Sequence, residues 1–119
     1  MAHAMGGLYD SPHGLCNAIA LVDVSRLNLP ACPERFAMMA RAAGINTNGI
    51  SDMKAGELFI DMIQELKDDL GITTRFADLG LKEKDLDGLS KFAAADICSE
   101  GNPMDIGFDN MRAVFKGCM

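Results

Sequence analysis

The histidine at position 13 is the residue whose surroundings point most directly to metal chemistry. It follows Pro12 and precedes Gly14, and an almost wholly apolar run covers residues 15–24. Pro12 fixes its own φ angle, whereas Gly14 lets a second backbone or a ligand approach closely. A histidine at the mouth of a buried helix needs a partner for its ring, and a metal ion is a common one. No other part of the sequence supplies a matching set of ligands, so His13 is interpreted as one part of a larger site.

Three further polar or reactive side chains have simpler interpretations. Asp10 lies in the turn before the helix, where Asp side chains usually bond to nearby backbone groups, so it is not assigned as a metal ligand. Asn17 lies one helical turn after His13 and is expected either to steady the imidazole ring or to cap the local backbone. Cys98 has no neighbouring histidine or lysine in the sequence to lower the pKa of its thiol, which argues against a nucleophile.

Helices must position these side chains, because the apolar residues recur with a helical period and no segment alternates with a period of two. The expected helices cover residues 13–27, 33–43, 52–70, 83–97 and 108–117, with a short helical turn at 75–79. Pro33 stands at a first helical position and Ser51 is a favourable N-cap. Gly44 and Gly71 lie just past two helix ends. The residues expected to face inward from 83–97 are Leu86, Leu89, Phe92, Ala93 and Ile97. The sequence therefore predicts an all-α fold, a bundle of about five helices.

Length and composition limit the class of protein. A chain of 119 residues is one domain that can bury about two thirds of its unfolded surface. An apolar content of 49% excludes a disordered chain. The net charge of −6 argues against a nucleic-acid backbone or an anionic membrane as a partner. No apolar run approaches the ~20 residues that span a bilayer.

Cysteine usage and the first residues favour a cytoplasmic protein. Cys16, Cys32, Cys98 and Cys118 are scattered and form no CxxC pair, so reduced thiols are expected. The first nine residues are short and glycine-rich and lack the basic start of a secretory signal. His3 is expected on a mobile terminal segment.

Four separated motifs, in the right order, resemble the C-terminal helical part of the iron-dependent (group III) alcohol dehydrogenases. Pro12-His13-Gly14 with Asn17-Ala18 resembles the family signature Pro-His-Gly-x-x-Asn-Ala. The segment 33–37 resembles the second helix of this region, and the segment 69–82 resembles its "LGIP…LxxLGV" passage. Asp96-Ile97-Cys98 with Asn102-Pro103 resembles its "DxC…NP" passage. The most similar subgroup is the 1,3-propanediol dehydrogenase and lactaldehyde reductase type.

The resemblance implies roles for three residues. His13 would be one of four metal ligands, the others being an Asp and two more histidines, and the metal would be Fe²⁺ or Zn²⁺. His3 lies ten residues earlier, where the family often has a second histidine close to the substrate and nicotinamide, and it would aid catalysis by proton transfer. Cys98 would lie in the substrate cleft as a small apolar wall residue.

The resemblance also implies a division of labour. Residues 1–119 would form a single helical, metal-carrying domain, whereas NAD(P) would be bound by a preceding α/β domain. No glycine-rich phosphate loop after a strand occurs in this sequence, so that nucleotide-binding domain is expected to be absent. The intact enzyme would interconvert small alcohols or diols and aldehydes by hydride transfer, and it would be a homo-oligomer. The fragment alone is expected to be inactive and to bind no metal tightly.

A different class of function stays open beside this one. The chain would then be a free-standing helical interaction module without catalysis. An upstream reading frame that encodes an α/β domain favours the dehydrogenase interpretation, whereas a natural start codon at Met1 favours the module.

Overall fold

The computed structural model describes residues 1–119, and its regular elements are all helical. The α-helices are α1 (Ala2–Tyr9), α2 (His13–Asn28), α3 (Pro33–Ala42), α4 (Asp52–Asp69), α5 (Leu86–Ala94) and α6 (Phe108–Gly117). Short 3₁₀ turns are η1 (Leu29–Ala31), η2 (Glu83–Asp85) and η3 (Ile97–Ser99). The predicted all-α class is confirmed. None of these helices combines the length and the apolar character that a membrane span requires.

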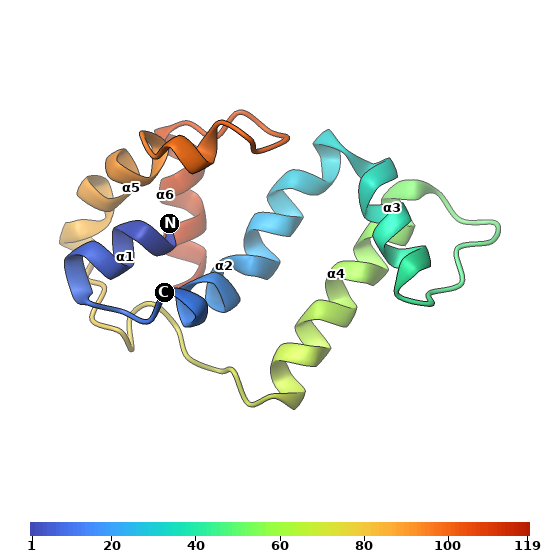
Figure 1. Ribbon diagram of the computed structural model, residues 1–119, viewed down its shortest axis with the longest axis horizontal. Coiled ribbons are helices and arrows are strands. Elements are labelled where there is room, and N and C mark those ends of the chain that lie inside the picture. Colours follow the sequence, from blue (N-terminus) through green and yellow to red (C-terminus); the bar gives the residue numbers. More distant parts are fainter.

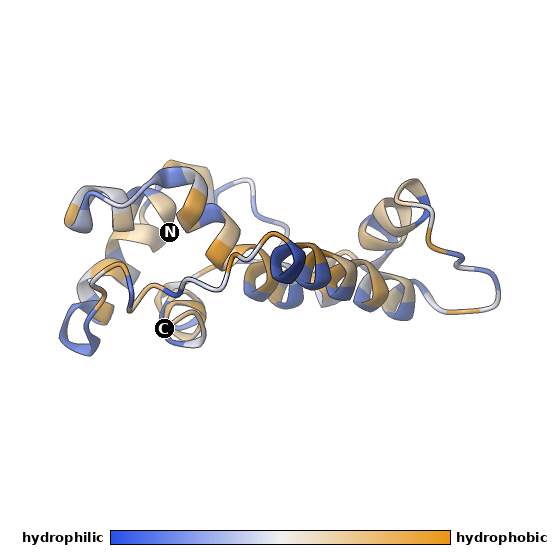
Figure 2. Cartoon of the chain, turned by 90° about the horizontal axis from the view of Figure 1, so that it is seen from below, coloured by the Kyte–Doolittle hydropathy of each residue, from blue (hydrophilic) through white to orange (hydrophobic).

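The helices form a flat molecule with two packed regions (Figure 1). Its extents are 46 × 31 × 19 Å. The larger region holds α1, α5 and α6 against α2 and contains a cluster of 15 buried residues. The smaller region holds α3 against α4, and its two clusters contain 5 and 3 buried residues. Figure 2 shows α4 with hydrophobic and hydrophilic residues on different sides, as an amphipathic helix requires.

Local signals set most helix ends. The Ser51 hydroxyl accepts a hydrogen bond from the Lys54 N–H at 3.2 Å, which confirms the predicted N-cap of α4. Gly44 and Gly71 follow α3 and α4 with φ angles of 85° and 68°, the left-handed conformation that glycine tolerates. Pro33 begins α3 as expected. The predicted bounds of α2, α3, α4 and α6 therefore agree with the structure to within one residue.

Helix α1 is the element that the sequence analysis missed, and His3 does not lie on a mobile segment. The two glycines in α1 lower its helix propensity, but Ala2, Ala4 and Met5 are buried in the larger core. Its end is held to η2 because the Tyr9 hydroxyl donates to Asp85 Oδ2 at 2.7 Å. Tertiary packing thus overrides a weak local preference.

The expected inward positions of Phe92 and Ile97 are wrong. Phe92 is 59% exposed and Ile97 is 76% exposed. The α-helix ends at Ala94, because Asp96 caps a separate turn by accepting the Cys98 N–H at 2.9 Å. Leu86, Leu89 and Ala93 are buried as predicted.

Gly56 of α4 lies close against Leu29 of η1 and Phe36 of α3. A Cβ atom added there would lie 2.9 Å from Phe36 Cβ and would overlap Leu29 Cδ1. The missing side chain therefore lets α4 lie against α3 and η1.

Candidate active site

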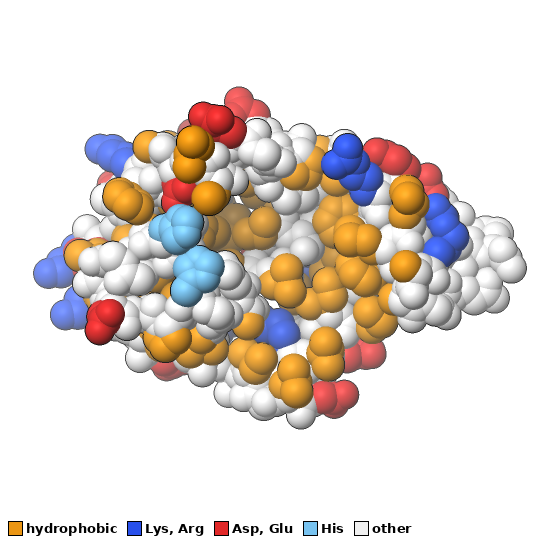
Figure 3. Space-filling model, in the orientation of Figure 1, with side chains coloured by type: hydrophobic (Ala, Val, Ile, Leu, Met, Phe, Trp, Pro, Cys, Tyr) orange, Lys and Arg blue, Asp and Glu red, His pale blue; other side chains and the backbone are white.

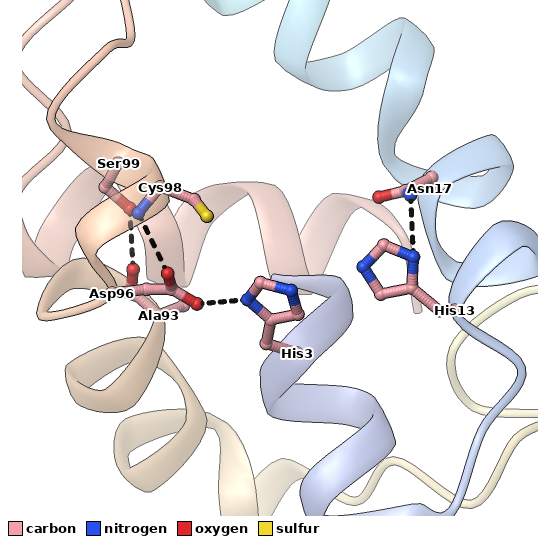
Figure 4. A network of polar contacts seen from close by, with 7 residues as sticks. All are labelled: His3, His13, Asn17, Ala93, Asp96, Cys98 and Ser99. Carbon is pink, nitrogen blue, oxygen red and sulfur yellow. Dashed lines mark hydrogen bonds and ion pairs between the residues drawn. The ribbon is translucent and has the colours of Figure 1, made fainter.

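The side chain of His3 is held in place by Asp96, an acidic residue far along the sequence. It lies on α1, and its Nδ1 atom is 2.7 Å from Asp96 Oδ2 (Figure 4). The His3 side chain is 52% exposed, whereas the Asp96 side chain is 11% exposed. The contact joins residues 93 positions apart in the sequence. The mostly buried carboxylate of Asp96 therefore orients the imidazole ring of His3.

Asp96 is held in its charged form by hydrogen bonds. The backbone N–H of Cys98 and then the ring of His3 lower the pKa of Asp96 to about 2. A carboxylate with this pKa is ionised throughout the neutral range. It therefore acts as a permanent acceptor for the Nδ1–H of His3.

Cys98 lies beside the same carboxylate. Its side chain is exposed, and the hydrogen bond to Asp96 together with the negative charge of Asp96 raises the pKa of the Cys98 thiol. A thiol with a raised pKa is a poor nucleophile at neutral pH. The turn around it is secured by Ser99, whose hydroxyl donates to the Ala93 carbonyl at 2.8 Å.

His13 begins α2 and faces solvent, so burial does not force a partner on its ring as the sequence analysis assumed. The amide nitrogen of Asn17 lies 3.2 Å from His13 Nδ1, and Asn17 therefore steadies the ring. The imidazoles of His3 and His13 are stacked, with centroids 5.1 Å apart and planes inclined by 28°. Two histidines ten residues apart are thus brought side by side by the turn between α1 and α2.

The two rings stand at the edge of an apolar cavity of about 450 Å³ (Figure 3). Its walls come from α2, including Ala20, Leu21 and Val24, and from Met111 and Val114 of α6. Cys98 lines the same cavity. A mostly apolar cleft of this size with a few polar groups at its edge is typical of a small-molecule site. The three residues singled out from the sequence, His3, His13 and Cys98, therefore share one cleft.

Asn102 lines another side of the cleft and pairs with Asn28 behind it. Asn28 at the end of α2 and Asn102 in the loop after η3 donate to each other's side-chain oxygens at 2.8 and 2.7 Å. Asn102 also donates to the Met104 carbonyl at 2.8 Å. These bonds hold the 100–107 loop against α2.

Asp96 is the site residue to which the sequence analysis gave no role. It belongs to a motif in the sequence, and an Asp directly before a short helical turn is a recognisable capping signal. Its contact with His3 could not be read from periodicity. His13, in turn, belongs to no group of three or more His, Cys, Asp or Glu side chains placed to hold a metal ion.

Comparison with known proteins decides the family. Residues 1–119 match the family model described as "Fe-containing alcohol dehydrogenase family, C-terminal". The chain belongs to this family. The resemblance seen in the sequence motifs is thereby confirmed.

Individual relatives agree with this assignment. The chain is similar to 1,3-propanediol dehydrogenase from Citrobacter freundii, with 48% identity over 116 residues that cover 98% of this chain and 30% of the relative. It is also similar to lactaldehyde reductase from Escherichia coli (strain K12), with 32% identity over 115 residues that cover 97% of this chain and 30% of the relative.

A solved structure shares the fold. The crystal structure of a 1,3-propanediol oxidoreductase superimposes with a TM-score of 0.93 at 40% identity, covering 99% of this chain and 31% of the other. The chain therefore spans about 30% of the length of the curated relatives it matches.

Proposed function

We propose that this chain is the helical, C-terminal part of a metal-dependent, NAD(P)-linked alcohol dehydrogenase. The intact enzyme would interconvert small alcohols or diols and aldehydes by hydride transfer. The observation that carries the proposal is the stacked pair of His3 and His13 at the edge of one apolar cleft. Family membership supplies the reaction class.

His13 fits the role of one metal ligand. The amide of Asn17 can present either its nitrogen or its oxygen to Nδ1, and with the oxygen facing the ring, Nδ1–H donates and Nε2 is free to bind a cation. Exposure of His13 at the cleft leaves room for ligands from elsewhere. A bound Fe²⁺ or Zn²⁺ would supply a Lewis acid that polarises the oxygen of an alcohol or aldehyde.

His3 is suited to move the alcohol proton. Because the ionised Asp96 accepts the Nδ1–H of His3, the Nε2 atom is left as a proton acceptor. Asp96 then stabilises the imidazolium that forms when Nε2 takes a proton. In this arrangement His3 is the proton-transfer residue and Asp96 is a positioning residue.

The apolar walls favour small, weakly polar substrates. Ala20, Val24 and Val114 offer no hydrogen bonds, so an alcohol chain would bury its carbons against them while its oxygen faces the histidines. Cys98 contributes one more weakly polar surface to this wall.

The remaining parts of the enzyme would lie outside this chain. An α/β domain would bring the nicotinamide and the other metal ligands, and the intact protein would assemble as a homo-oligomer. The cytoplasm is the proposed location, because all four cysteines are unpaired and suit a reducing compartment.

The test begins with the genomic DNA upstream of the codon for Met1. If it encodes an α/β domain in frame, the longer protein is loaded with Fe²⁺ and NADH formation from 1,3-propanediol is measured. Replacing a proton-transfer residue costs about 10²–10⁴-fold in rate, so His3→Ala should lose at least about 100-fold. His13→Ala should lose metal and activity together, and the 119-residue chain alone should form no NADH.

Two outcomes would overturn the proposal. One is an intact protein with full activity after His13→Ala. The other is an upstream sequence that encodes no α/β domain, which would favour the helical interaction module instead.

A further inference from the structure

We propose that His3, Asp96 and Cys98 form a second metal site, separate from His13, that takes a thiophilic divalent cation such as Zn²⁺. This site goes beyond the proposed function, because it needs neither the α/β domain nor a nicotinamide. All three ligands belong to the chain described here, so the site runs against the expectation from the sequence that the fragment binds no metal tightly, which took no account of Asp96 and Cys98 as ligands.

The distances between the ligand atoms fit one cation. One atom from each of the three side chains lies within 4.8 Å of the other two. His3 Nδ1 and Asp96 Oδ2 are 2.7 Å apart. With zinc–ligand bonds of about 2.0–2.3 Å in a tetrahedron, ligand atoms lie about 3.3–3.8 Å from one another. A cation therefore enters after the nitrogen and oxygen separate by under about an ångström and the sulfur moves closer by at most about 1–1.5 Å.

The backbone around the cluster is already fixed, whereas its side chains can adjust. Asp96 and Cys98 belong to one capped turn that the Cys98 N–H closes at 2.9 Å. His3 comes from α1, whose neighbouring residues are buried in the core. The side chains of His3 and Cys98 are exposed, so each can shift toward a cation without displacing the core. Two independent elements thus present ligands to one point, as metal sites require.

The ligand types select the kind of cation. Imidazole and thiolate favour Zn²⁺ and related ions over Mg²⁺ and Ca²⁺, which prefer sets of oxygen atoms. When the cation binds, Cys98 releases its thiol proton to solvent and the ring proton of His3 moves from Nδ1 to Nε2. Three protein ligands leave a fourth position for water at the edge of the cleft.

His13 is excluded from this site by geometry. Its ring stacks on the ring of His3, and it is no member of the cluster. A cation held by His3 would replace the bond between His3 and Asp96. If the proposed function holds, excess Zn²⁺ would then compete with proton transfer by His3.

The experiment titrates the 119-residue chain with Co²⁺ without oxygen and then displaces it with Zn²⁺. A sulfur-to-cobalt charge-transfer band is expected to grow to one equivalent and to vanish on addition of Zn²⁺. Cys98→Ser should abolish the band and weaken Zn²⁺ binding at least tenfold by calorimetry, and Asp96→Asn should also weaken it at least tenfold. His13→Ala is the matched control, since it removes an exposed histidine from the same cleft, and both signals should persist.

Several results would overturn the site. They are a charge-transfer band that survives Cys98→Ser, Zn²⁺ binding that His13→Ala abolishes, and a wild-type chain that gives no band. Circular dichroism of each variant confirms that the helices are retained. The measurement involves no substrate or nicotinamide, so its failure leaves the proposed dehydrogenase function untouched, and a lack of dehydrogenase activity leaves this site untouched.

Discussion

The amides of Asn28 and Asn102 form a reciprocal pair in which each nitrogen donates to the other's oxygen. Asn28 is buried at the end of α2 and lies 74 residues before its partner. Side-chain hydrogen bonds, rather than backbone bonds of a helix or sheet, therefore hold the 100–107 loop against α2. The shape of the cleft on this side therefore depends on two side chains.

Removing one amide should lower the free energy of unfolding by more than the net contribution of one hydrogen bond, because the other amide is left without its partner. Asn28→Ala leaves the Asn102 side chain partly buried without its partner, and we expect a loss of about 1–3 kcal/mol in the free energy of unfolding. The double variant with Asn102→Ala should lose less than the sum of the two single losses, because the pair is coupled. Urea unfolding measures all three, with the exposed Asn48→Ala as a control. Strict additivity would show that the two amides act independently.

Two glycine-to-alanine substitutions should change the free energy of unfolding in opposite directions. Gly56→Ala forces a methyl group onto Leu29 and Phe36, and overpacking of this kind costs about 1–3 kcal/mol. Gly88 lies in α5 with nothing within 4 Å of an added Cβ atom, so Gly88→Ala should stabilise the chain by about 0.5–1 kcal/mol. Thermal unfolding of both variants checks the pair. Equal stabilisation by both would contradict the close approach of α4 to α3.

The stability of the chain should fall with acidification in a window set by Asp96. Its pKa is lowered from 3.8 to about 2 in the folded chain, so the folded state favours the ionised carboxylate. This contribution is complete above the unfolded pKa and is lost as the pH falls through the folded pKa. We expect the stability difference between wild type and Asp96→Asn to be constant near neutral pH and to shrink between pH 3.8 and about 2. Urea midpoints across that range provide the measurement, and a difference that stays constant to the lowest pH would argue against this role.

The isolated chain should associate with a second copy through apolar surface beside α1. Leu8 and Phe92 are 57% and 59% exposed, and they line a second cavity of about 440 Å³ between α1 and α5. Exposed apolar surface of this kind favours burial against another molecule, and a two-fold interface closes on itself. Light scattering after size-exclusion chromatography should give a dimer mass at tens of micromolar, and the Leu8→Ser, Phe92→Ser double variant should return a monomer. A monomeric wild-type chain would show that this surface forms no interface between copies of the chain.

The sequence predicted the helices that begin and end on local signals. The Ser51 cap, the glycine stops and Pro33 each act within a few residues, so the ends of α3 and α4 could be predicted. Helix α1 was not predicted, because its stability comes from burying Ala2 and Met5 against distant helices. Ile97 is exposed because Asp96 caps a separate turn after α5, whereas Phe92 lies beside the buried face of α5 that Leu89, Ser90 and Ala93 form.

The candidate site was predictable only in part. His13 carries a local motif, and the turn before it sets its distance from His3. Asp96 reaches His3 across 93 positions, and nothing in the helical period indicates such a contact. Long-range polar pairs of this kind depend on how helices meet and are therefore found only in three dimensions.

The unequal division of the core has a consequence for how the chain opens. The region of α3 and α4 is stabilised by two small clusters of buried side chains, whereas α1, α5 and α6 enclose the large cluster. Partial opening should therefore start at α3 and α4, and amide hydrogens there should exchange with solvent sooner than those of α6. His3, His13 and the cleft lie in the region where exchange should be slower. The site should therefore stay assembled while α3 and α4 unfold locally.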